Sequence, residues 1–203
     1  MNNEVLSQGA HRILEVAAHL FARQGYAGVS INDIAAEVGV SKANVFHHFA
    51  SKEALYLAVI DAACDEFKTE LECLKNHERD VALGLKQVAC QHLMRLLSNP
   101  DPARLVLREV FKGESGIDSS QVAKILHRNF ALLVEQIERG QVSGQFRRDT
   151  DPAMVAVTLI AQNIFFFQSW EILRQFPEFQ NLDCAERLSA AAFDSLSKGL
   201  FAK

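Results

Sequence analysis

Three side chains near residue 45 have the types and the spacing needed to read base pairs. On a helix with about 100° per residue, Ala43, Asn44 and His47 lie on one face. An asparagine amide can pair with the donor and the acceptor on an adenine edge, and alanine leaves room for a thymine methyl. Lys42 lies on the first turn, within reach of a base or a phosphate. We therefore predict a recognition helix that enters a major groove.

A short helix before this run begins with a capping box. Asp33 follows Ser30 at a spacing of three residues, so the hydroxyl and the carboxylate can each satisfy a backbone N–H of the first turn. Ile34, Ala35 and Val38 then form an apolar stripe at helical spacing. The pattern predicts a helix whose inner face packs on a core.

The connection between the two helices is marked by glycine and serine. Gly39 can adopt the left-handed conformation that ends one helix, Ser41 can cap the next, and Val40 can fill the space between them. Val45 and Phe49 lie opposite the polar face and must pack inward. This spacing is typical of a helix-turn-helix unit. The alternative is a plain αα-hairpin, which the polar outer face and the apolar inner face disfavour.

A further helix is expected to start at Ser51–Lys52–Glu53. Its first turn combines the positive side chain of Lys52 with free backbone N–H groups, an arrangement suited to docking a phosphate. The adjacent His47 and His48 offer a different reading as a metal pair. Neighbouring residues on a helix diverge by about 100°, and no nearby Cys or Asp completes a ligand set, so we predict no metal site.

The stretch GYAGVSINDIAAEVGVSK at 25–42, continued by VFHHFASKEAL at 45–55, resembles the signature of the TetR family of bacterial transcription regulators. The resemblance implies that Ser30 and the helix start at Lys52 contact phosphates and that His48 lies beside the DNA backbone. It also implies that four positions face the groove: Lys42, Ala43, Asn44 and His47. The full predicted DNA-contacting set is Ser30, Asn32, Lys42, Ala43, Asn44, Phe46, His47, His48 and Lys52.

Phe46 departs from the family pattern. The family usually has tyrosine at this position, and the tyrosine hydroxyl binds a phosphate. Phe46 lacks that hydroxyl and can offer only apolar contact. More of the predicted DNA contact therefore rests on the other residues of the set: Lys42, Asn44, His47, His48 and Lys52.

Bulk charge gives no support for a nucleic-acid partner. The formal net charge is −4, and residues 1–55 carry four Lys or Arg against five Asp or Glu. Any contact with DNA must come from a few well-placed donors and helix N-termini rather than from a basic surface.

Long runs without proline or glycine predict an all-α fold. We expect about nine helices: a three-helix helix-turn-helix DNA-binding domain at 1–55, then a helical effector-binding and dimerisation domain at 56–203. An amphipathic first helix at 11–24 ends at Gly25. The later predicted runs are 52–75, 79–97, 101–112, 119–140, 151–175 and 183–202.

The segment 152–170 carries no charged residue, which raises the alternative of a membrane span. Five polar residues interrupt it, and Asp151 and Glu171 flank it, so we predict a helix buried between its own core and a second subunit. The resemblance to TetR implies a homodimer through the last two helices, about 151–175 and 183–202. Two recognition helices on a twofold axis would read a palindromic operator.

Aromatic and polar residues in the second domain offer candidate contacts for a small apolar or amphipathic effector. Apolar walls with a few fixing groups are typical of ligand pockets, although aromatic residues at helical spacing are also ordinary core. The candidates are His92, Phe111, His127, Phe130, Asn163, Phe166, Phe167 and Trp170.

The remaining composition argues for an ordinary cytoplasmic protein without a cofactor. The N-terminus lacks the basic-then-apolar pattern of a secretory signal. The four cysteines form no C-x-x-C pair, and we expect reduced thiols rather than disulfides or a zinc site.

The sequence motifs give little support for an enzyme. His77–Glu78 lacks the second histidine of H-E-x-x-H, and Ser195–Lys198 fits S-x-x-K without companion motifs. A purely architectural DNA protein would not need the long apolar second domain. We expect a homodimeric repressor that binds a palindromic operator and is released by the effector. A TetR-like activator, or a regulator with a protein partner in place of the ligand, stays open.

Overall fold

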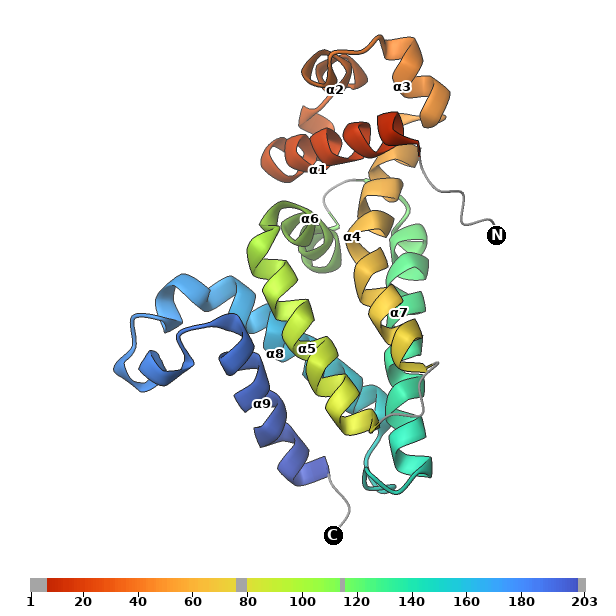
Figure 1. Ribbon diagram of the computed structural model, residues 1–203. Helices are drawn as coiled ribbons and strands as arrows, with labels where there is room; N and C mark the ends of the chain where they lie inside the picture. Colours follow the sequence, from red (N-terminus) through yellow and green to blue (C-terminus); the bar gives the residue numbers. More distant parts are fainter. Residues whose placement is uncertain (1–6, 76–79, 114–115, 201–203) are drawn as a thin grey trace. The chain divides into compact units, whose positions relative to one another are not determined.

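The computed structural model describes residues 7–75, 80–113 and 116–200, and every regular element among them is a helix (Figure 1). The predicted all-α class is therefore confirmed. His77 and Glu78 lie outside the described residues. The elements are α1 (Gln8–Gly28), α2 (Ile31–Val38), α3 (Lys42–His48), α4 (Lys52–Lys75), α5 (Val81–Ser98), α6 (Pro100–Lys112), α7 (Ser119–Val142), α8 (Pro152–Leu173), the 3₁₀ helix η1 (Pro177–Leu182) and α9 (Ala185–Leu200).

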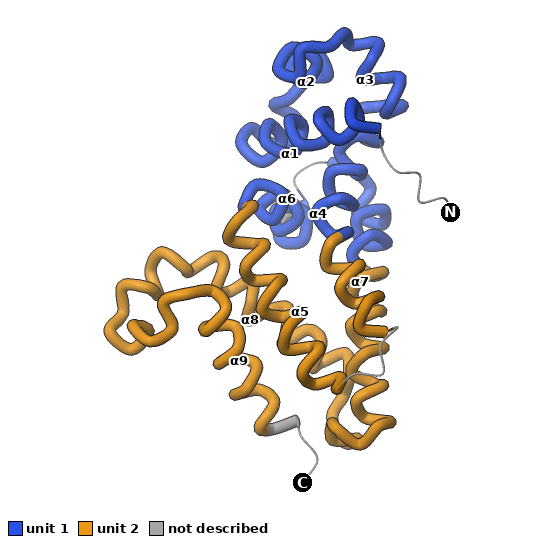
Figure 2. Tube along the Cα trace, in the orientation of Figure 1, with its two compact units in different colours: residues 1–65, 100–126 blue, residues 66–99, 127–203 orange. Residues whose placement is uncertain are grey.

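The chain divides into two compact units, coloured separately in Figure 2. Unit 1 comprises residues 1–65 and 100–126, and unit 2 comprises residues 66–99 and 127–203. Helices α4 and α7 contribute residues to both units. The two units are defined by contacts between segments of the chain. The domain boundary expected between residues 55 and 56 comes instead from the family resemblance, and it remains a prediction.

Helix α1 is longer than the sequence indicated and is interrupted where glycine predicts a stop. Ser7 caps it by accepting a hydrogen bond from the Ala10 backbone N–H at 3.2 Å. Ile13, Ala17 and Phe21 are buried on its inner face. At Gly25 the backbone leaves the helical region, with φ 75° and ψ 168°, before a last short stretch ends at Gly28. The positive φ is a conformation that glycine adopts without a Cβ clash.

Helix α6 forms hydrogen bonds with α1 and α4 within unit 1. Arg108 donates hydrogen bonds to the carbonyl oxygens of Phe21 at 3.1 Å and Ala22 at 2.8 Å. These carbonyls lie just before the break at Gly25, so the guanidinium satisfies acceptors that the interrupted helix leaves free. The Tyr56 hydroxyl on α4 donates to Glu109 Oε1 at 2.6 Å. The packing of α1 and α4 behind the helix-turn-helix therefore depends on residues about 50 to 90 positions further along the chain.

Unit 2 has its own core, in which α5 packs against α8 and α9. Its members come from each α-helix of the unit and include Leu71, Leu85, Ile137, Ala156 and Phe193. Asp151 caps α8 by accepting from the N–H groups of Ala153 and Met154. The two C-terminal runs predicted at 151–175 and 183–202 correspond to α8 and α9, and η1 occupies the segment between them.

Candidate nucleic-acid interface

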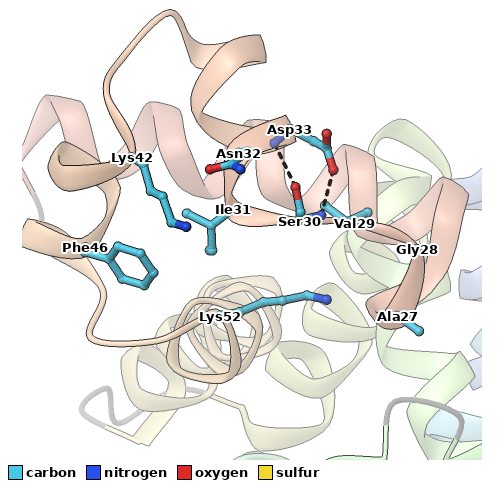
Figure 3. Close-up of a pocket in the computed structure, with 10 residues that line it drawn as sticks. All are labelled: Ala27, Gly28, Val29, Ser30, Ile31, Asn32, Asp33, Lys42, Phe46 and Lys52. Atoms are coloured by element: carbon cyan, nitrogen blue, oxygen red, sulfur yellow. Dashed lines mark hydrogen bonds between the residues drawn. The ribbon is translucent and has the colours of Figure 1, made fainter.

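Helix α2 starts with the capping box that the sequence predicts (Figure 3). Asp33 N–H donates to Ser30 Oγ at 3.2 Å, and Ser30 N–H donates to Asp33 Oδ2 at 2.8 Å. Hydrogen bonding of the Asp33 carboxyl to the side chain and the backbone N–H of Ser30 holds the pKa of this carboxyl below its usual value. The start of α2 is thus tied by reciprocal hydrogen bonds, and Ser30 is fixed at the surface.

The turn after α2 is made by Gly39, as expected. Its φ of 80° and ψ of 34° lie in the left-handed region. Its N–H donates to the carbonyl oxygens of Ala35 and Ala36, and the Val40 N–H donates to Ala35 at 2.9 Å. Val40 packs against the core of unit 1. These bonds end α2 and direct the chain into α3.

Helix α3 presents the polar face outward. Ser41 Oγ caps it by accepting from the Asn44 N–H at 3.1 Å. Val45 is fully buried, and Phe49, just after the helix, is 7% exposed. Ala43, Asn44 and His47 are all exposed. The orientation predicted from helical spacing is therefore present, while the base contacts themselves remain predictions.

A surface hollow of about 340 Å³ lies between α2, α3 and the start of α4. Figure 3 shows its lining, which includes five of the residues predicted to contact DNA: Ser30, Asn32, Lys42, Phe46 and Lys52. Two ammonium groups, a hydroxyl and an amide thus border one concave surface. Such a donor set can bind a phosphate group without a broad basic patch.

Aromatic rings support both lysines of the hollow. Lys52 Nζ lies 4.2 Å from the centroid of the Tyr26 ring, and Lys42 Nζ lies 5.8 Å from that of Phe46. Both distances are within the range of a cation–π interaction. Partial burial lowers the pKa of the Lys52 ammonium, and the nearby charge of Asp33 opposes this effect. Phe46 therefore retains a use without a hydroxyl, because its ring faces the Lys42 ammonium.

Sequence reasoning gave no role to Ile31, which lines the hollow, or to Tyr26, which contacts Lys52. Tyr26 lies within the quoted family stretch, but only the folded chain reveals that its ring supports Lys52. Ile31 is 7% exposed and belongs to both the core and the lining of the hollow. Apolar and aromatic residues next to a helix-turn-helix are usually core, so the sequence offers no signal that separates these two.

His47 and His48, both predicted to contact DNA, do not line the hollow. His47 is exposed, and its ring centroid is 5.2 Å from that of the half-buried His48. His48 Nε2 faces the start of α1, 3.4 Å from the position that a Cβ on Gly9 would occupy. Among the described residues, no group of three His, Cys, Asp or Glu is placed to hold a metal ion.

The effector candidates do not gather in one place. A small cavity in unit 2 includes two of them, His92 and Asn163, together with Phe67, Leu85, Val88, Ala89, Leu133, Leu159 and Ile160. Phe130 packs against the core of unit 2, and Phe166, Phe167 and Trp170 are half-buried on α8. Phe111 is 68% exposed on α6, and His127 is exposed on α7. The apolar lining was missed because core and pocket positions share the same helical spacing.

Residues 13–59 match the family described as bacterial regulatory proteins, tetR family. Residues 83–192 match the tetracyclin repressor-like C-terminal domain. The chain belongs to the TetR family. The resemblance found in the sequence is thereby confirmed, and the chain is a transcription regulator of this family with a helix-turn-helix DNA-binding domain.

Individual TetR-type relatives agree with this assignment. The regulator YerO of Bacillus subtilis is 37% identical over 78 residues, which span 38% of this chain and 26% of that protein. RutR of Escherichia coli K12 is 26% identical over 178 residues, covering 78% of this chain and 84% of RutR. The structure of Bacillus subtilis FadR in complex with stearoyl-CoA aligns with a TM-score of 0.72 at 17% identity, over 93% of this chain and 98% of FadR. The family and these relatives are transcription regulators rather than enzymes.

Proposed function

We propose that this protein is a homodimeric repressor that occupies a palindromic operator until a small effector binds its C-terminal domain. The observation that carries the proposal is the polar face of α3. Ala43, Asn44 and His47 are exposed on a helix whose other side is anchored by buried Val45 and Phe49. A rigid helix that presents small, amide and imidazole groups can read base edges in a major groove.

The hollow beside α3 supports the same proposal through the DNA backbone. Lys42 and Lys52 border it, and Ser30 at the start of α2 adds a hydroxyl. Phosphate contacts of this kind set the register of a recognition helix, whereas the base contacts supply specificity. A DNA-binding domain with almost no net charge can therefore bind DNA, because Lys42 and Lys52 lie beside the hollow that we propose for a phosphate.

The direct test is a gel-shift assay of the full-length protein on the promoters of its own and adjacent genes at moderate salt. We expect a complex that survives an excess of random competitor DNA. The absence of any specific complex at these promoters would contradict the proposal. Deleting the gene should raise transcription from the bound promoter, whereas a fall would indicate an activator.

Asn44→Ala should relax sequence preference. If the Asn44 amide pairs with one base, its loss reduces discrimination at that position by about 1–3 kcal/mol. Binding titrations on the operator and on a set of single-base variants measure this effect. Asn181→Ala, which removes an exposed amide from η1, serves as the control. An equal loss on operator and random DNA would show that Asn44 does not read a base.

Lys52→Ala should weaken binding to all sequences alike. Each subunit loses one phosphate contact, so the plot of log K against log salt concentration should become less steep by about one per subunit, or about two for the dimer. Titrations at several salt concentrations measure the slope, with Lys124→Ala at an exposed position on α7 as the control. An unchanged slope for Lys52→Ala would remove this lysine from the DNA-contacting set.

The dimer part of the proposal rests on the outer face of α8. Met154, Val157, Phe165 and Ile172 are between 46% and 62% exposed and follow one another at helical spacing. The opposite face, with Val155, Leu159 and Asn163, is buried in unit 2. A contiguous apolar stripe of this kind marks an interaction surface. A second copy packed against α8 and α9 would form a four-helix interface.

Length and composition would also allow α8 to cross a membrane, and it is the one such helix among the described residues. We favour a second subunit, because the buried face of α8 carries Asn163, whose hydrogen bonds run to α5 and α9. Those bonds belong to a helix that packs in a water-soluble core. We accordingly place the regulator in the cytoplasm with its DNA.

The effector part of the proposal requires two states of the dimer. An effector shifts the equilibrium only if it binds one state more tightly than the other. We propose that the effector favours the state in which the two DNA-binding domains are wrongly spaced for the half-sites. FadR, solved with stearoyl-CoA, shares the fold and supports a small-molecule role for the C-terminal domain.

A further inference from the structure

The ammonium group of Lys52 is held by an aromatic ring and not by a carboxylate. Nζ lies over the Tyr26 ring, 4.2 Å from its centroid, and no ion pair of Lys52 is found within the part of the chain that the structure describes. The nearby carboxylate of Asp33 accepts the Ser30 backbone N–H at 2.8 Å. A neutral ring attracts an ammonium group without cancelling its charge. The charge of Lys52 therefore stays available to a phosphate.

The contact with Tyr26 also restricts a side chain that would otherwise be mobile. Lys52 lines the hollow with Ser30 and Asn32, and Figure 3 shows its side chain extended there. A free lysine side chain samples many rotamers, and binding a phosphate must select one orientation. Contact with the ring makes part of that selection before DNA arrives.

The Tyr26 ring is braced from behind by buried aromatic rings. Its centroid lies 4.9 Å from that of Tyr56, edge to face, and 6.0 Å from that of Phe21. Tyr56 and Phe21 are fully buried and stack edge to face with each other at 5.0 Å. The hydrogen bond from the Tyr56 hydroxyl to Glu109 fixes this group further. Tyr26 cannot turn away from Lys52 without disturbing the core of unit 1.

The backbone break in α1 determines where Tyr26 lies. Tyr26 follows Gly25, whose φ of 75° and ψ of 168° take the chain out of the helical path. Any side chain at Gly25 would be strained at this positive φ. The position of the Tyr26 ring is thus set by the local backbone and by the core together.

We propose that Tyr26 is a positioning residue for DNA binding, whose ring holds the Lys52 ammonium in the orientation that meets a phosphate. The inference rests on the proposed function, in which Lys52 contacts the DNA backbone. Tyr26 does not line the hollow. Its effect on DNA binding therefore runs through Lys52.

Tyr26→Leu in the full-length protein removes the ring and keeps an apolar side chain. We expect affinity to fall on operator and random DNA alike, because a phosphate contact carries no sequence information. Ordering one long side chain costs a factor of about two to seven in each subunit, or about four- to fiftyfold for the dimer. Tyr26→Phe keeps the ring and should bind as the wild type does. Phe179→Leu, at a half-buried ring on η1, is the control for loss of an aromatic residue elsewhere.

A double-mutant cycle separates positioning from a general effect on the fold. If Tyr26 acts through Lys52, Tyr26→Leu should have little further effect on affinity in a Lys52→Ala protein. If Tyr26 only supports the fold, the loss should be the same with and without Lys52. Titrations of the four proteins on one operator fragment measure the difference.

NMR of the wild type tests the contact even if Tyr26→Leu does not fold. The Hε signals of Lys52, assigned by their absence in Lys52→Ala, should lie upfield of those of exposed Lys124, because the ammonium lies over an aromatic ring. Addition of operator DNA should leave them upfield, since the ring holds the ammonium in the bound orientation.

Several results would overturn the positioning role. They are an equal loss in both backgrounds of the cycle, a loss in Tyr26→Phe as large as that in Tyr26→Leu, and Lys52 signals at the position of those of Lys124. Lys52→Ala separates this failure from a failure of the proposed function. If Lys52→Ala weakens binding and Tyr26→Leu does not, only the role of Tyr26 fails, whereas wild-type binding by Lys52→Ala removes the phosphate contact itself.

Discussion

Phe165→Glu is expected to convert the protein into a monomer that barely binds its operator. Phe165 is 59% exposed in the middle of the apolar stripe on α8, where the proposed interface would bury it. A glutamate there would place an unpaired charge in the centre of that interface on each subunit, and burial of such charges is strongly unfavourable. Loss of the second DNA-binding domain removes the advantage of bivalent binding, about 100-fold or more.

Light scattering coupled to size exclusion measures the mass, and gel shifts measure operator affinity. Val142→Glu is the matched control, because Val142 is also an exposed apolar residue of unit 2 but lies at the end of α7. We expect this control to remain dimeric and to bind DNA normally. A dimeric, fully active Phe165→Glu protein would remove α8 from the interface.

Asn163→Ala is expected to lower the free energy of unfolding by about 2–3 kcal/mol. The truncation removes the partner of the Ala89 carbonyl, the Ser189 hydroxyl and His92 Nδ1. Asn163 and Ser189 are both buried, so water cannot easily replace the lost bonds. Unsatisfied buried groups account for most of the expected loss.

Urea unfolding followed by circular dichroism, at one fixed protein concentration, measures the effect of Asn163→Ala. Asn181→Ala on η1 is the control and should change the free energy of unfolding by about 0.5 kcal/mol or less, because Asn181 is exposed. Equal stability of the two variants would show that the network joining α5, α8 and α9 contributes little.

Much of the DNA-binding domain could be predicted, because the hydrogen bonds and spacings that define it join residues close together in the sequence. The Ser30–Asp33 capping box, the left-handed Gly39 and the Ser41 cap involve residues within four positions of one another. The inward and outward faces of α3 follow from helical geometry alone. Distant packing does not alter such short-range hydrogen bonds and spacings, so the sequence determined this substructure.

The packing within each of the two units depended on contacts between distant segments. Arg108 reaches Phe21 and Ala22, and Asn163 links Ala89 to Ser189. Helical periodicity identifies an apolar face without showing what covers it. For this reason Phe111 and His127 resembled pocket residues in the sequence but are exposed in the structure.

The polar face of α3 was thus determined by about thirty consecutive residues, because the caps, turns and faces of short helices depend on residues close together in the chain. Only the tertiary structure brought Tyr26 under Lys52, linked Asn163 to α5 and α9 and left one face of α8 exposed. Each of these features arises where side chains far apart in the chain meet or fail to meet. Local spacing carries no information about such encounters.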